Sequence, residues 1–229
     1  MTNKYLKSLI DKLNKNKSDG LIHLRPLTAT VDFAKVWTEK PKPTDNISFP
    51  DGPYKFYFIK NLDGLFVATV LDMERDLHWF VDSKHRQQGH LTKAMKEIIL
   101  FHLFQDREEQ RVTIDKNQIG EKDFISSQNV ALSLGFVQAE NNDYVLTRDK
   151  YQTDNFIYGQ NTQITEERLD ELKKKINYLG RSLWVIQTEI EMKLGDTDYA
   201  EELKELVDEI KKQTWRLEDA WWESKKVTV

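Results

Sequence analysis

The 229-residue sequence contains no cysteine. This excludes a disulfide framework, a thiolate metal site and a cysteine nucleophile, and it suits a reducing compartment. The sequence also has no run of about eighteen apolar residues, so we expect no transmembrane helix. Residues 1–17 lack the uninterrupted apolar core of a secretory signal. We therefore expect a cytoplasmic protein.

An excess of charge of either sign is missing too. Lysine and arginine number 34 against 38 aspartates and glutamates, a net charge of −4. Such a balance provides no global basic field for nucleic acid or for an anionic membrane, so we expect neither as a partner. The five histidines show no spacing typical of metal ligands, and no metal site is expected. A Gly-x-Ser-x-Gly elbow, a Walker loop and a dinucleotide fingerprint are likewise absent.

What is present predicts a folded chain. Hydrophobic residues make up 39% of the sequence and aromatic residues 11%, with six tryptophans, which is enough to build a core. The length accommodates one domain of ordinary size with an appendage. From the changes in composition and periodicity we expect an N-terminal amphipathic helix (1–19), an α/β domain (20–150), a polar linker (151–162) and a helical hairpin (163–229).

Residues 77–104 form the central stretch of the α/β domain. Leu77, Trp79 and Val81 alternate with other residues at a period of two, which predicts a strand. From Leu91 onward apolar residues recur every three to four positions, which predicts an amphipathic helix. The loop between them carries Gly89. Unpaired amides at the start of such a helix attract phosphate, and a glycine there lets a ligand approach the main chain. An ordinary strand-to-helix turn would produce the same local pattern.

The N-terminal part of the chain predicts a helix, a strand and a second helix. Residues 3–15 place four apolar residues on one helical face, and we expect that helix to pack on the main body rather than on a membrane surface. Residues 21–25 read as a strand that Pro26 ends. Thr28 is expected to cap a helix that reaches residue 37. Four of the five prolines then fall in residues 41–53, which form either the rim of a substrate site or a plain connector.

The middle of the chain predicts a sheet with flanking helices. Residues 54–59 and 65–71 read as a hairpin, and the strand at residue 77 continues it antiparallel. Residues 111–115 are reached by a helical crossover, so we expect this strand to lie parallel to the one at residue 77. A helix over 122–134 and a hairpin over 136–147 follow. The fold class is α/β (α+β), a single mixed sheet with flanking helices.

Two motifs in this order resemble a known family. Arg86-Gln87-Gln88-Gly89-His90-Leu91 resembles the Arg/Gln-x-x-Gly-x-Gly/Ala loop of the GCN5-related N-acetyltransferases (GNAT). The stretch from Ser126 to Phe136 resembles the family's penultimate helix, which ends in Leu-Gly-Phe. The order of elements over residues 21–148 is similar as well. The sequence departs from the loop pattern at its last position, where Leu91 replaces a small residue.

The resemblance implies acetyl-coenzyme A as cosubstrate and a set of site residues. In the family, the loop amides hold the diphosphate, and a slot between two central parallel strands takes the pantetheine arm. This implies contacts from Phe80, Val81, Arg86, Gln87, Gln88, Gly89, His90, Leu91, Thr92 and Asn129.

The catalytic groups are less well defined by the sequence. The tyrosine that protonates the leaving thiolate in many relatives corresponds to Ala131 here, so that acid is missing. The candidate bases are His78 and Glu74. For His78 the alternative is a strand histidine with no role.

Two functions follow from these observations. The first is an acetyl-coenzyme A-dependent N-acetyltransferase that acts on an amine of a small molecule or a protein. The second is a catalytically inactive GNAT-like binding or scaffold protein that acts through its helical hairpin. The identity of the acceptor amine is not encoded in any motif of the sequence.

The C-terminal appendage predicts a coiled-coil-like hairpin. Alternating steps of three and four residues predict its first seam, formed by Leu169, Leu172, Ile176, Leu179, Leu183, Ile186 and Ile190. Residues 195–198 break the pattern, and a second helix follows with Leu203, Leu206, Ile210 and Leu217 inward. Three tryptophans (Trp215, Trp221 and Trp222) exceed what this seam needs. They indicate docking on the main body, on a second copy of the chain or on a protein partner.

Overall fold

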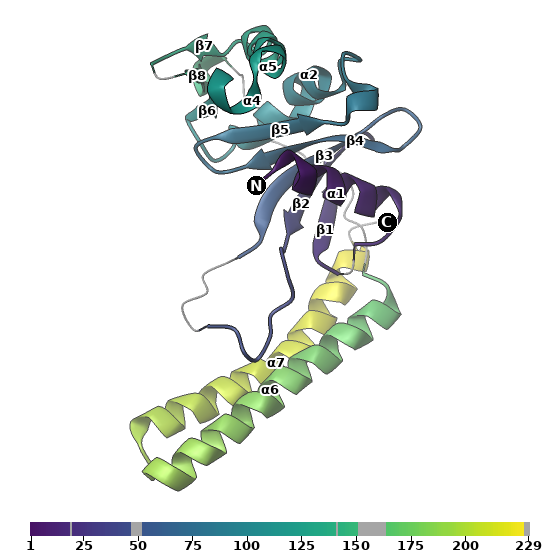
Figure 1. Ribbon diagram of the computed structural model, residues 1–229. Helices are drawn as coiled ribbons and strands as arrows, with labels where there is room; N and C mark the ends of the chain where they lie inside the picture. Colours follow the sequence, from purple (N-terminus) through teal and green to yellow (C-terminus); the bar gives the residue numbers. More distant parts are fainter. Residues whose placement is uncertain (19, 47–51, 141, 151–163, 227–229) are drawn as a thin grey trace. The chain divides into compact units, whose positions relative to one another are not determined.

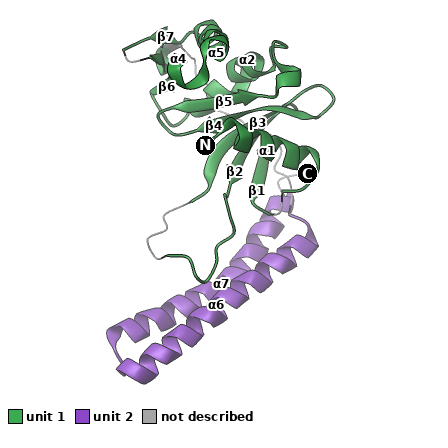
Figure 2. Cartoon of the chain, in the orientation of Figure 1, with its two compact units in different colours: residues 1–161 green, residues 162–229 purple. Residues whose placement is uncertain are grey.

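The computed structural model describes residues 1–18, 20–46, 52–140, 142–150 and 164–226. The chain divides into two compact units, residues 1–161 and residues 162–229 (Figure 2). The linker predicted over residues 151–162 lies outside the described residues. The two units are described separately below.

Unit 1 is a mixed α+β unit (Figure 1). Its strands are β1 (Ile22–Pro26), β2 (Val31–Val36), β3 (Tyr54–Lys60), β4 (Phe66–Asp72), β5 (Leu77–Val81), β6 (Glu109–Thr113), β7 (Val137–Gln138) and β8 (Asp143–Thr147). Its helices are α1 (Asn3–Asn14), α2 (His90–Ala94), α3 (Leu100–Leu103), α4 (Lys116–Ile119) and α5 (Glu121–Ser133), with short turns η1 (Ser83–His85), η2 (Met95–Ile99) and η3 (Arg148–Lys150).

A five-stranded antiparallel sheet, in the order β1-β2-β3-β4-β5, forms the centre of unit 1. Successive side chains of a strand point to opposite faces, so the four consecutive buried residues of β3, Phe56 to Ile59, serve two cores. Phe56 and Phe58 belong to the core cluster that includes α1, whereas Tyr57 and Ile59 belong to the cluster that includes α2 and α3. The hairpin predicted from residues 54–71 is confirmed, as is its antiparallel continuation into β5.

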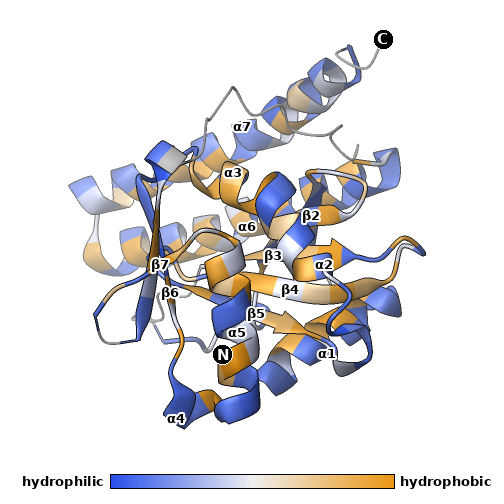
Figure 3. Ribbon diagram, turned by 90° about the horizontal axis from the view of Figure 1, so that it is seen from above, coloured by the Kyte–Doolittle hydropathy of each residue, from blue (hydrophilic) through white to orange (hydrophobic). Residues whose placement is uncertain are grey.

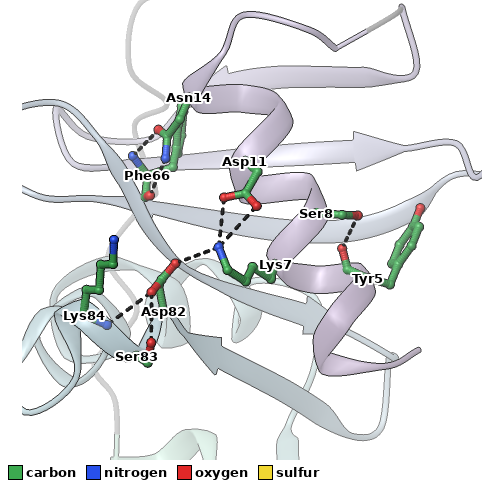
Figure 4. Close-up of polar contacts among 9 residues, drawn as sticks. All are labelled: Tyr5, Lys7, Ser8, Asp11, Asn14, Phe66, Asp82, Ser83 and Lys84. Carbon is green, nitrogen blue, oxygen red and sulfur yellow. Dashed lines mark hydrogen bonds and ion pairs between the residues drawn. The ribbon is translucent and has the colours of Figure 1, made fainter.

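The N-terminal helix α1 packs on one face of this sheet, as predicted. Its four apolar residues Leu6, Leu9, Ile10 and Leu13 are all buried. Polar contacts fix both halves of the helix (Figure 4). The Lys7 ammonium lies 3.1 Å from the Asp82 carboxylate, at the end of β5. The Asn14 side chain exchanges two hydrogen bonds, of 2.8 and 2.9 Å, with the main chain of Phe66 in β4.

The helix predicted from Thr28 to residue 37 is wrong, because this segment forms strand β2. The Thr28 hydroxyl accepts hydrogen bonds from the amides of Thr30 (3.2 Å) and Val31 (3.1 Å). It therefore closes the β1–β2 hairpin turn instead of capping a helix. The β-branched Thr30 and Val31 fit an extended backbone better than a helix. Pairing with β1 and β3 on either side then decides the outcome.

A helix on the other face of the sheet follows β5, as the central stretch predicts. It runs without interruption from His90 to Leu103, as α2, the π-helical turn η2 and α3. Its buried residues include Met95, Ile99 and Leu100, each 0% exposed. The second core cluster gathers around them.

The predicted single sheet is also wrong. β6 pairs with β8, and β8 with β7, in a separate three-stranded antiparallel sheet. β6 meets β5 through one isolated bridge, between Asp76 and Arg111, and that bridge is parallel as expected. The predicted helix over 122–134 corresponds to α5, and the short α4 before it was not predicted.

Unit 2 is a helical hairpin of α6 (Glu166–Leu194) and α7 (Asp198–Lys226). The helices run antiparallel, since Gly180 meets Ile210 and Lys173 pairs with Glu218 at 2.5 Å, closer to the base of the hairpin. Hydrophobic residues recur along both helices (Figure 3).

The predicted seam is wrong at three positions. Leu179, Ile186 and Leu206 are 58%, 52% and 50% exposed. The buried positions near them are Gly180, Gln187 and Val207. A Cβ at residue 180 would lie 3.2 Å from Ile210 Cγ2, so glycine permits the close approach of the two helices. Among the helices described in either unit, none is long and apolar enough to cross a membrane.

Candidate functional site

The site begins where β5 and β6 separate. The Asp76 carboxylate accepts hydrogen bonds from the Leu77 and Thr113 amides, both at 2.9 Å. The single parallel bridge between Asp76 and Arg111 lies at the same place. Beyond it the five-stranded sheet ends at β5, while β6 continues in the other sheet. Within the described part of the chain, one edge of β5 is consequently without a strand partner along most of its length.

A cleft of about 940 Å³ opens along this edge. Its walls are β5, the loop and helix start over residues 83–92, the end of β6 over residues 112–115, and the α4–α5 segment. The volume lies in the range of small-molecule and cofactor sites in proteins. Most of the predicted site residues line it, namely His78, Phe80, Val81, Arg86, Gln87, Gly89, His90, Leu91, Thr92 and Asn129. Glu74 and Gln88 are not among the lining residues.

Hydrogen bonds at the two ends of β5 reveal which main-chain groups face the cleft. The Met73 amide donates to the Asp76 carbonyl at 3.0 Å, and the Asp82 amide donates to the Val67 carbonyl at 2.9 Å. In an antiparallel pair, successive residues direct their main-chain groups to alternate edges. The main-chain N–H and C=O groups of the even-numbered β5 residues therefore point toward β4, and those of the odd-numbered residues point toward the cleft.

The main-chain groups of Trp79 and Val81 face the cleft, whereas those of Phe80 face β4. The Val81 carbonyl already accepts a hydrogen bond from Arg86 Nε at 3.3 Å. The open edge of Trp79 and Val81 is of the kind that takes an extended, amide-containing ligand.

The loop before α2 presents main-chain amides to the cleft. Gln87 and Gly89 both have a left-handed backbone, with φ of 61° and 78°. Gly89 precedes the helix without a side-chain cap. Among the described residues, none accepts a hydrogen bond from the amides of residues 88–92. Successive free amides at a turn and a helix start form a concave site for anions.

Arg86, one of the contacts implied by the family resemblance, is already paired. The Arg86 guanidinium lies 3.0 Å from the Asp123 carboxylate, which belongs to the first turn of α5. The two side chains are 43% and 40% exposed, so the pair is weak. It links the loop to α5 along one side of the cleft. An anion bound at the loop would compete with Asp123 for Arg86.

His78 lies on β5, and its imidazole Nε2 is 3.0 Å from the Asn3 side-chain oxygen of α1. Burial lowers the pKa of His78, and the positive charge of the N-terminal amino group lowers this pKa further. The imidazole is therefore neutral at neutral pH, as a general base must be. A neutral imidazole also suits a plain structural contact with α1.

Glu74 occupies the turn between β4 and β5. Its backbone is left-handed, with φ of 67°, and its amide donates to the Asp72 carboxylate at 2.8 Å. The Arg107 guanidinium holds the same turn, with contacts of 2.9 Å to Asp72 and 2.6 Å to the Glu74 carbonyl. Because the Glu74 side chain is not among those lining the cleft, its position favours a role in the turn over a role as base.

The last position of the loop motif is accommodated by the core. Leu91 is only 6% exposed and belongs to the core cluster beneath α2. Its extra bulk is therefore absorbed by helix packing. Gln88, the preceding loop residue, donates to the Lys84 carbonyl at 3.2 Å and lies 3.1 Å from the His90 imidazole.

Sequence reasoning missed one wall of the cleft. It is lined by Thr113 at the end of β6, by Asp115 two residues beyond that end, and by Gln118 and Lys122 from the α4–α5 segment. The predicted parallel direction of β6 could have identified Thr113 and Asp115, because neighbouring parallel strands end at the same edge of a sheet. No comparable signal marked Gln118, because α4 is a single turn.

Ala131 is 0% exposed, and it is not a lining residue, although its neighbours Asn129 and Val130 are. No group of three potential metal ligands exists within the described ranges. Comparisons of the chain with protein-family models, with curated proteins and with solved structures found no match.

Proposed function

We propose that unit 1 binds acetyl-coenzyme A in the cleft between β5 and β6 and transfers the acetyl group to an amine. The observation that carries this proposal is the separation of the two strands beyond Asp76. It leaves a strand edge, a loop of free amides and a helix start around one cavity. The strand-loop-helix motif that resembles the GNAT loop supplies all three.

The residues present fit such a ligand. The amides of residues 88–92 would hold the diphosphate, because they are successive and free of partners among the described residues. The main chain of Trp79 and Val81 would pair with the amides of the pantetheine arm. Arg86 and Lys122 are the arginine and lysine side chains that line the cleft, and either can approach a phosphate.

Acetyl transfer requires three things of the protein. The amine nitrogen must lose a proton, its bond to the thioester carbonyl carbon must form in place of the carbon–sulfur bond, and the thiolate must gain a proton. His78 fits the first requirement, because its lowered pKa keeps it neutral. Ala131 cannot meet the last, so water or another residue of the cleft would supply that proton.

A second function is supported by specific observations. Ala131 has no side-chain proton to give, and Asp123 occupies the guanidinium of Arg86. Both features suit a protein that binds coenzyme A without catalysis, with the hairpin as its working surface. Neither proposal names the acceptor amine, which can belong to a small molecule or to a protein.

Calorimetric titration with acetyl-coenzyme A tests both functions. We expect one site per chain, with coenzyme A competing for it. Absence of binding at millimolar ligand would contradict both functions. A second measurement, thiol release across a panel of small amines and lysine peptides, separates them. Release above the rate without protein supports the enzyme, and tight binding without release supports the binding protein.

A further inference from the structure

The hairpin carries an apolar flank that its own two helices leave uncovered. This flank, called here the Leu179 flank, consists of Leu179 and Ile186 on α6 with Tyr199 and Leu206 on α7. The exposed fractions of these four side chains are 58%, 52%, 56% and 50%. Each of the four immediately precedes a buried seam residue in the sequence, as Leu179 precedes Gly180 and Leu206 precedes Val207. All four therefore lie on the same side of the seam. Such positions flank the seam of a coiled coil.

The two exposed flanks of the hairpin differ in chemistry. On the opposite flank, Lys173 pairs with Glu218 at 2.5 Å. The Lys211 ammonium lies 4.3 Å from the centre of the Trp184 ring on that same flank. Charged side chains therefore bridge the helices there, while the Trp184 side chain remains 50% exposed. The Leu179 flank has no such bridge between described residues of α6 and α7.

Charges border the Leu179 flank in an ordered way. Lys175 and Arg216 lie on its basal half, where the two helices begin and end. Glu189 and Glu202 lie on the half toward the tip, where α6 turns into α7. All four are exposed. Within the described chain, Lys175 and Glu202 have no ion-pair partner. Glu189 pairs with Lys193, and Arg216 lies 3.9 Å from Glu209, each on its own helix.

This pattern is self-complementary. With 1.5 Å of rise per residue, Lys175 and Glu189 lie about 21 Å apart along α6. A two-fold axis midway between them, at the level of Ser182, exchanges the basic half with the acidic half. The same operation places Leu179 at the level of Ile186 and Leu206. One symmetry element thus matches the charges and the apolar side chains together.

We propose that a second copy of this chain binds the Leu179 flank, so that two hairpins form an antiparallel four-helix bundle. Helices with apolar residues at the seam and on one adjoining flank are typical of such bundles. Opposite charge at the rim and apolar contact at the centre are the features of a specific interface. The proposal concerns unit 2 alone and is independent of the acetyltransferase proposal.

Sedimentation of the full-length chain over a range of concentrations tests it. We expect a dimer at micromolar concentration. Ile186→Glu should raise the dimer dissociation constant at least about thirtyfold, because a central apolar contact is lost twice in a symmetric interface. Val185→Glu is the matched control. It makes the same change at a 69% exposed neighbour that points away from the flank, and it should leave the dimer intact.

Charge reversal gives an independent readout that does not depend on the apolar contacts. Lys175→Glu should weaken the dimer, and adding Glu189→Lys should restore it. Circular dichroism must show unchanged helix content in each variant. A monomeric wild-type chain overturns the proposal. A dimer that survives Ile186→Glu but is lost in Trp184→Glu also overturns it, since that interface would use the other flank.

Discussion

The Asp76 carboxylate accepts a hydrogen bond from the Thr113 main-chain amide at 2.9 Å. With a second hydrogen bond from the Leu77 amide, also at 2.9 Å, it joins β5 to β6 at the point where they separate. Asp76→Ala leaves both amides without this acceptor. We expect the free energy of unfolding to fall by about 1–3 kcal/mol, measured by urea denaturation.

Asp76→Asn is the matched control for this change. Its side-chain oxygen can still accept both hydrogen bonds, so we expect a loss well below that of the alanine variant. Equal losses in the two variants would show that charge, and not the acceptor, matters at this position.

The left-handed backbone at Gly89 predicts a second effect. A side chain at φ of 78° costs about 1–2 kcal/mol, and relief of that strain would turn the free loop amides. We expect Gly89→Ala to weaken coenzyme A binding about tenfold, equivalent to about 1.4 kcal/mol. Gly64→Ala has nearly the same strain, at φ of 81° in the β3–β4 turn. It should lower stability without changing affinity, and an equal loss of affinity would contradict the role of the loop.

The ion pair between Arg86 and Asp123 predicts that removing the Asp123 charge raises the affinity for coenzyme A. Asp123→Asn releases the guanidinium and removes a negative charge from the cleft, so coenzyme A should bind severalfold more tightly. Arg86→Gln should weaken binding, with a smaller dependence on salt. The stability of either variant should change by about 1 kcal/mol or less, because the pair is exposed. Calorimetry at two salt concentrations measures both effects.

The lowered pKa of His78 predicts a pH profile. Burial, aided by the N-terminal charge, keeps the pKa of this imidazole below its ordinary value of about 6.5. If His78 is the base, kcat/KM rises with pH through that lowered pKa and is level above it. His78→Gln should then abolish this limb and lower the rate at least tenfold. His23→Gln, on an exposed strand position, is the control. An unchanged profile in His78→Gln would leave His78 with a structural role.

The buried pair of Arg107 and Asp72 predicts a large loss of stability. The Asp72 side chain is 2% exposed and lies 2.9 Å from the Arg107 guanidinium. Arg107→Met leaves the carboxylate buried without its cation, and we expect a loss of about 3–5 kcal/mol. Arg148→Met, which removes an exposed pair with Glu108, should cost about 1 kcal/mol or less. Chemical denaturation of both variants compares them, and similar losses would contradict the role of burial.

Much of the local structure could be predicted from the sequence. The α1 stripe, the hairpin from β3 to β4, the strand-loop-helix around Gly89 and the two long C-terminal helices each follow from a repeating apolar period. The failure at β2 has a local cause. Its apolar residues fit both a helical and an extended spacing, and Thr28 can close a hairpin turn as well as cap a helix.

The candidate site was only partly predictable. The residues on β5 and the loop come from one continuous stretch, so a single motif indicates them. Asp123 and Thr113 are each 37 residues away from their partners Arg86 and Asp76. Lys122 has no sequence signal of its own. Contacts of this kind depend on how β6 and α5 return to the cleft, which periodicity does not encode.

The sequence by itself determined most of the helices and strands, with β2 and α4 as exceptions, and where the loop of free amides lies, because backbone conformation and amphipathic period are local properties. Only the tertiary structure decided that the sheet divides at Asp76, that Arg86 meets Asp123, and that Gly180 rather than Leu179 lies in the hairpin seam. Each of these results from packing between distant segments, where close approach and burial select one face among several of similar hydrophobicity.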